Sequence, residues 1–200
     1  MNQHETATDE PSRECVAYHE AGHAGASIRL GRRFRYVTIR PNDESLGHVK
    51  PWTMPPSFRP DIEVTPTGER LLRDRVMILL AGGLAAEKHC PGIDSGDSLM
   101  IDGFIVGGDI HHAVDYAMYV TGGDSDEAGL YVGWLRHRTS ALLSSPSVWA
   151  GVGAIAAALL EHERLTLAQA GDAWRRGVHE YIERAQAQRG VTSPFGTSRD

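Results

Sequence analysis

The residues His19-Glu20-Ala21-Gly22-His23 place two histidines four positions apart, with a glutamate directly after the first. On an α-helix, residues four apart lie on one face, about 6 Å apart along the axis. Two imidazoles arranged in this way can hold one zinc ion through bonds of about 2.0–2.1 Å. The glutamate then lies beside the ion and can accept a proton from a metal-activated water. The motif predicts His19 and His23 as zinc ligands and Glu20 as the general base of a zinc peptidase.

A catalytic zinc site of this kind needs a third protein ligand. The metzincin extension HExxHxxGxxH does not supply it, because Ala26 and Arg29 occupy the two later positions. The ligand must therefore come from elsewhere in the chain, and position alone leaves five acidic residues open: Glu87, Asp94, Asp97, Asp102 and Asp109. Three of them lie in an irregular stretch rich in glycine and aspartate, where a carboxylate is hard to hold. Asp109 opens a predicted helix, whose backbone N–H groups favour an ionised carboxylate.

The motif itself requires a helix to position it. Ser12 is a suitable N-cap, residues 13–30 contain no proline, and Gly31 is placed to end the helix. Small residues fill the middle of this segment, which is typical of a buried helix packed closely by its neighbours. We therefore expect the two histidines to lie in the middle of a helix.

The rest of the chain predicts a mainly α (α+β) fold, a single helical domain with a small antiparallel β element beside the motif helix. Residues 34–40 alternate apolar and polar side chains as a half-buried strand does, and residues 46–50 can form a second strand. Helices are expected over residues 67–91, 109–121, 126–143, 146–163 and 166–188. Residues 1–11 are expected to form a flexible tail, residues 12–188 the peptidase domain, and residues 189–200 a disordered tail.

The composition of the chain argues against several classes of protein. The net charge of -6 offers no basic surface for nucleic acid. No apolar run reaches about 18 residues, so no membrane segment is expected. The first ten residues are polar and unlike a signal peptide. The two cysteines, Cys15 and Cys90, are too few for a disulfide framework, and Cys15 is expected to be a small buried apolar residue. A reduced, cytoplasmic protein is the simplest interpretation.

Three other histidines and one strand are open to two interpretations. His48, on the second strand, could polarise a substrate carbonyl or simply be exposed. At least one of His111 and His112 is expected to face solvent. The strand at residues 34–40 is either an exposed edge that pairs with an extended substrate or a cover for the core.

Five segments in order resemble the peptidase domain of the FtsH family of ATP-dependent zinc metalloproteases. They are AYHEAGHA, VTIRPNDESLGHV, ILLAGGLAAEKH, VGGDIHHAVDYAMYV and IAAALLEHERLT, and the resemblance covers about residues 12–170. They are similar to the zinc helix, the following strand–turn–strand with its P…LG pattern, the LAGRAAEE helix, the GASNDLxxATxLAR segment and the late LAxxLLExETL helix. The resemblance implies Asp109 as the third zinc ligand and a structural role for Glu87.

The same resemblance implies hydrolysis of peptide bonds in unfolded proteins or peptides, with zinc as cofactor. No GxxxxGK[ST] motif is present, so the chain is expected to lack the ATPase of that family and to take unfolding, if needed, from a separate ATPase partner. Members of the family assemble as hexamers, but we do not extend this expectation to the present chain. Two alternatives stay open: a non-catalytic zinc-stabilised module that binds unfolded segments or an ATPase, and a hydrolase of small amides.

Overall fold

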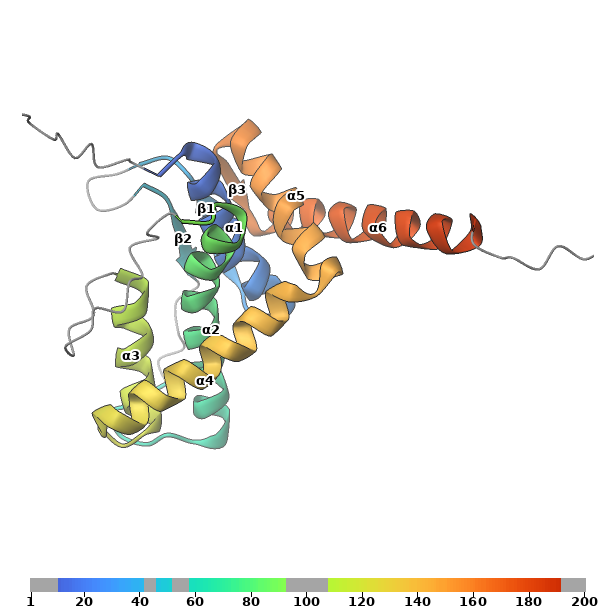
Figure 1. The fold of residues 1–200 in the computed structure, drawn as a ribbon. Helices are drawn as coiled ribbons and strands as arrows, with labels where there is room; N and C mark the ends of the chain where they lie inside the picture. The colour runs from blue at the N-terminus through green and yellow to red at the C-terminus, as the bar shows by residue number, and fades with distance from the viewer. Residues whose placement is uncertain (1–10, 42–45, 52–57, 93–107, 192–200) are drawn as a thin grey trace, which may run out of the picture.

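The computed structural model describes residues 11–41, 46–51, 58–92 and 108–191, and it confirms a mainly helical fold with a small antiparallel sheet (Figure 1). The helices are α1 Arg13–Arg29, α2 Pro66–His89, α3 Gly108–Val120, α4 Ser125–Ser144, α5 Pro146–His162 and α6 Leu167–Val191. The strands are β1 Phe34–Thr38, β2 His48–Pro51 and β3 Arg164–Thr166.

The ends of α1 are where the capping residues predict them. The hydroxyl of Ser12 accepts a hydrogen bond from the backbone N–H of Cys15 at 3.3 Å, which satisfies one of the free donors of the first turn. After the helix, Gly31 has a left-handed φ of 69°, the conformation that glycine adopts most easily at this position. The motif therefore lies in the middle of a helix, as expected.

The middle of α1 packs against α2 and α5 without space for larger side chains. Ala17, Ala21 and Ala24 are fully buried. A Cβ added to Gly22 would overlap the carbonyl oxygen of Ala81 on α2, so the two helix backbones are almost in contact. The small residues in this segment thus place the motif against α2.

A second apolar cluster holds α3 against α2 and α4. Its buried members are Val76, Met77, Leu80, Ile110, Ala113 and Leu135. Ile110 and Ala113 lie on one face of α3, directly after Asp109, so their burial fixes the start of this helix. The predicted anchoring of Asp109 by an apolar face is confirmed.

The sheet has three strands in the order β2-β1-β3, one more than the sequence predicts. Both pairs are antiparallel, with Thr38 opposite His48 in one and opposite Arg164 in the other. The prediction that β1 could be an exposed edge is wrong, because β1 is the central strand and has a partner on each side. Among the described strands, β2 and β3 are the edges of the sheet.

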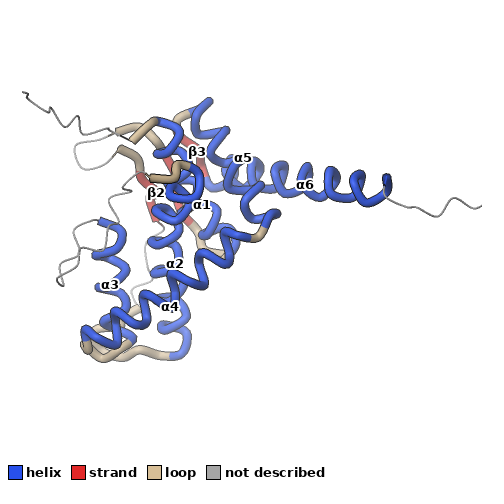
Figure 2. Tube along the Cα trace, viewed as in Figure 1, coloured by secondary structure: helices blue, strands red, loops and turns tan. Residues whose placement is uncertain are grey.

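The last three helices complete the packing: α5 lies against α1 in the main apolar cluster, α6 packs against α5, and α4 lies against α2 and α3 (Figure 2). α4 and α5 meet at Ser145, directly before a proline at the first position of α5. α6 begins against the sheet and packs against α5, and its later part extends away from the other helices. It continues to Val191, beyond the residue 188 that the sequence predicts. In the described ranges no single helix is long and apolar enough to cross a membrane; by length and composition, only α4 and α5 together reach that size, across a bend of 83°.

A disulfide joins Cys15, at the start of α1, to Cys90, directly after α2, with 6.1 Å between their Cα atoms. Cys15 is buried, as predicted, but the prediction of reduced cysteines is contradicted by the structure. The pairing arises because α1 and α2 pack side by side with the start of one near the end of the other. Sequence spacing carries no sign of this arrangement, since 75 positions separate the two cysteines.

We predict that the disulfide contributes several kcal/mol to stability. Closing a loop of 75 residues in the unfolded chain corresponds to about 4 kcal/mol in the chain-entropy model. Reduction of the metal-free wild type with dithiothreitol should therefore lower its urea midpoint. The Cys15→Ala/Cys90→Ala variant should have the lower urea midpoint without any reductant, and dithiothreitol should not change that midpoint. Equal midpoints for the oxidised and reduced wild type, with thiol titration confirming both states, would contradict the prediction.

Candidate metal centre

Three potential ligand atoms meet between α1 and α3: Nε2 of His19, Nε2 of His23 and Oδ2 of Asp109. The two histidine nitrogens are 3.0 Å apart, and the carboxylate oxygen is 3.2 Å from His19 and 2.9 Å from His23. In the described part of the chain, this is the one group of three or more His, Cys, Asp or Glu residues close enough to share an ion. The structure thus brings together the three residues that the sequence predicts as ligands.

The backbone of α2 orients His23. Its Nδ1 lies 2.7 Å from the carbonyl oxygen of Ile78, so Nδ1–H donates a hydrogen bond and the neutral ring presents the lone pair of Nε2 to the centre of the group. A hydrogen bond of this kind on the far nitrogen is typical of histidines that bind metals.

The electrostatics of the metal-free group favour a cation. Burial opposes protonation of His23, but the Asp109 carboxylate raises the pKa of this ring to about 10. Burial opposes ionisation of Asp109, and the nearby histidines lower the pKa of this carboxyl overall. In the metal-free group a proton on His23 thus neutralises the negative charge of Asp109. A bound metal ion would neutralise the same charge. The separations of 2.9–3.2 Å are close to the value of about 3.3 Å expected between ligands on a tetrahedral zinc.

A glycine on α2 leaves the space that the group requires. A Cβ added to Gly82 would overlap the imidazole of His23 and lie 2.8 Å from Nε2 of His19. This glycine therefore faces the ligand atoms themselves.

Glu20 lies next to the group and is almost fully enclosed, with 4% of its surface exposed. Among the described residues its Oε2 has no hydrogen-bond partner, and its Cγ and Oε1 lie against the backbone at Gly47. Burial raises the pKa of this carboxyl, with the nearby histidines opposing the effect. A carboxylate that is buried, has no partner for one oxygen and holds its proton more strongly than usual is suited to accepting a proton during a reaction.

The other acidic candidates do not join this group. Glu87 is exposed and forms an ion pair with Arg136 at 3.1 Å, so the alternative of direct metal ligation by Glu87 is wrong. Asp94, Asp97 and Asp102 lie outside the described residues.

The three histidines with two open interpretations, His48, His111 and His112, do not join the group either. His111 and His112 are both exposed, which confirms the expectation for this pair. His48 contacts the hydroxyl of Tyr36 through Nε2 at 3.2 Å, while Val49 beside it packs against the core, so the two side chains lie on opposite faces of the sheet. The hypothesis that His48 polarises a substrate carbonyl gains no support from this placement.

Sequence reasoning missed three features of the centre: the Ile78 carbonyl, the space at Gly82 and the contact of Gly47 with Glu20. The first is a backbone atom and has no residue type that could mark it. The two glycines are visible in the sequence, but only the packing of three separate segments reveals what each one faces.

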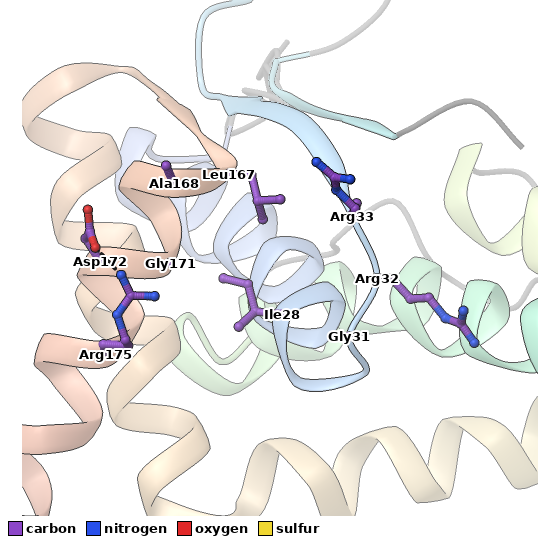
Figure 3. Close-up of a pocket in the computed structure, with 9 residues that line it drawn as sticks. All are labelled: Ile28, Gly31, Arg32, Arg33, Leu167, Ala168, Gly171, Asp172 and Arg175. Atoms are coloured by element: carbon purple, nitrogen blue, oxygen red, sulfur yellow. Dashed lines mark hydrogen bonds and ion pairs between the residues drawn. The ribbon is translucent and has the colours of Figure 1, made fainter.

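The pocket drawn in Figure 3 lies elsewhere, between the end of α1 and the start of α6, with a volume of about 450 Å³. Ile28 and Leu167 contribute apolar side chains to it. Arg32 in its lining forms an ion pair with Asp74, and Arg175 forms one with Asp172. None of the metal-centre residues lines this pocket.

Comparison with known proteins adds no assignment to this geometry. No protein-family model matches the chain, and no curated protein sequence matches it at a significant level.

Proposed function

We propose that the protein is a zinc metallopeptidase with His19, His23 and Asp109 as ligands and Glu20 as general base. The observation that carries the proposal is the meeting of three ligand atoms within 3.2 Å of one another, beside a buried carboxylate with a partnerless oxygen. The resemblance of the chain to the FtsH peptidase domain supports the same assignment.

The donor set favours zinc over calcium or magnesium. Two imidazole nitrogens and one carboxylate oxygen are typical ligands of zinc, whereas calcium and magnesium prefer oxygen. Three protein ligands also leave one position of a tetrahedral ion available for water or substrate, as in catalytic sites. When bound, zinc supplies Lewis-acid polarisation of a carbonyl and activation of water.

The residues of the chain then complete the reaction. Glu20 accepts a proton as the water oxygen attacks the carbonyl carbon of the peptide bond. It returns that proton to the nitrogen of the leaving amine as the C–N bond breaks, so that one carboxylic acid and one amine are formed. Asp109 neutralises positive charge in the centre, and the Ile78 carbonyl holds the His23 ring in place.

The proposed substrates are unfolded proteins or peptides. Within the described sheet β2 has a strand neighbour on one side only, so an extended polypeptide could pair with its free edge. A separate ATPase is the partner that the family resemblance suggests for folded substrates. A cytoplasmic location stays a prediction, and the Cys15–Cys90 disulfide is of a kind that persists in oxidising compartments.

We predict that Glu20→Gln abolishes peptide cleavage and leaves zinc bound. Removal of a general base typically lowers the rate by about 10²–10⁴-fold, whereas the three ligands are unchanged. Cleavage of casein and of short fluorogenic peptides should be compared for zinc-loaded and chelator-treated protein.

The matched control is Glu87→Gln, which removes an exposed carboxylate far from the ligands and should retain wild-type cleavage. Zinc binding without cleavage of any peptide by the wild type would favour the non-catalytic module. Cleavage limited to small amides would favour the alternative that the protein is a hydrolase of small amides.

We predict that Gly82→Ala removes metal binding as effectively as His23→Ala. The added methyl group would occupy the space directly against both imidazoles. Metal content after dialysis should fall from about one zinc per chain to a trace.

Gly129→Ala on α4 is the control, because nothing lies within 4 Å of the added Cβ. If Gly82→Ala binds zinc with wild-type affinity, the assignment of the centre fails.

We predict that zinc affinity decreases as the pH is lowered. In the metal-free protein the pKa of His23 is about 10, so below that pH the ring carries a proton that zinc must displace. Displacement of one proton weakens binding by about tenfold for each pH unit. Calorimetry in buffers of different ionisation enthalpy should show release of about one proton per zinc near neutral pH. An affinity that does not change between about pH 6 and pH 8 would contradict this charge arrangement.

A further inference from the structure

The backbone at Gly47, directly before β2, lies against the side chain of Glu20. A Cβ added at Gly47 would lie 2.8 Å from Cγ and 2.9 Å from Oε1 of Glu20. It would also lie 2.9 Å from the carbonyl oxygen of Thr38. These separations are shorter than carbon atoms tolerate, so any larger residue must move either the carboxylate or the strand.

Neither side of this contact can move freely. On one side, Thr38 pairs with His48, the residue after Gly47, and thereby ties this backbone to the central strand. On the other side, Glu20 lies on α1 between the two histidines, and α1 is packed against α2 and α5. Gly47 does not have a left-handed φ, so alanine fits its backbone conformation and only the space is missing.

We propose that Gly47 is a positioning residue that holds the Glu20 carboxylate in its working orientation. The backbone of the segment entering β2 forms a wall against Cγ and Oε1, while Oε2 remains without a protein partner and available for proton transfer. This role rests on the proposed peptidase function, since it matters for catalysis only if Glu20 is the base.

The contact at Gly47 also connects Glu20, the proposed base, to the sheet. β2 follows Gly47 directly, and its free edge is the one to which an extended substrate could be added. Gly47 therefore fixes the distance between the segment that would hold the substrate and the group that transfers the proton. A misplacement of about 1 Å in such an arrangement can lower a rate by about 10²-fold.

The contact can be tested without activity by a double-mutant cycle on the metal-free full chain. Gly47→Ala should lower the thermal midpoint in the wild-type background and lower it much less in a Glu20→Ala background, where the carboxylate no longer obstructs the methyl group. The contact with Thr38 is present in both backgrounds, so the difference reports Glu20 alone. Additive effects of the two substitutions would overturn the proposal.

The catalytic consequence is tested on the zinc-loaded protein. Gly47→Ala should lower kcat for a fluorogenic peptide by about 10–10²-fold, with KM and zinc affinity within about threefold of wild type. The absorption spectrum of the cobalt-substituted variant should match that of the wild type, because no ligand is touched. Gly129→Ala, with open space around the added Cβ, should leave all four measurements unchanged.

The outcomes separate the two proposals. An unchanged kcat for Gly47→Ala, or a loss explained wholly by reduced zinc affinity, would overturn the positioning role while leaving the peptidase proposal intact. A wild type that binds zinc and cleaves nothing would overturn the peptidase proposal and, with it, the catalytic role of Gly47. Should Gly47→Ala fold poorly, the Gly47→Ala/Glu20→Ala variant removes both Cγ and Oε1 and should recover part of the thermal midpoint; no recovery would overturn the proposal.

Discussion

The contact between α1 and α2 is the constraint on which the metal centre depends. Gly22 lets the backbone of α1 approach the Ala81 carbonyl, and Gly82 lets the backbone of α2 approach the two imidazoles. Each glycine within a helix costs about 1 kcal/mol relative to alanine. This close approach brings the Ile78 carbonyl oxygen within 2.7 Å of Nδ1 of His23 and places Gly82 directly against the two imidazoles.

Most of the helical framework could be predicted because its signals are local. Ser12 and Gly31 mark the ends of α1 through capping and a left-handed φ, and Pro146 marks the start of α5. Asp109 could be singled out among five acids because it opens a helix with an apolar face and because its segment resembles the one that supplies the ligand in the FtsH family. Its position beside His19, 90 residues earlier, follows from packing that places α3 and α1 on the same side of α2, which only the structure describes.

The features that the sequence did not predict are those created by long-range packing. β3 has three residues, too few for an alternating pattern, and it exists because Glu163 turns the chain with a φ of 59°. The Glu163 carbonyl then accepts hydrogen bonds from the backbone of Ile39 and the hydroxyl of Thr38. This turn places β3 beside β1 and converts a predicted edge strand into the centre of the sheet. The disulfide has the same origin, since the packing of α1 against α2 brings together two cysteines that are distant in sequence.

The proposed division of labour between Glu20 and Asp109 follows from what surrounds each carboxylate. Asp109 contacts two imidazoles, and the nearby histidines lower its pKa overall, so it remains ionised and suited to ligation. Glu20 is more deeply buried, one of its oxygens has no partner in the described part of the chain, and burial raises its pKa. A buried polar atom left unpaired costs about 1–3 kcal/mol, a cost with no structural benefit in a site that serves stability alone. The environment of Glu20 is therefore easier to reconcile with a catalytic centre than with a structural one.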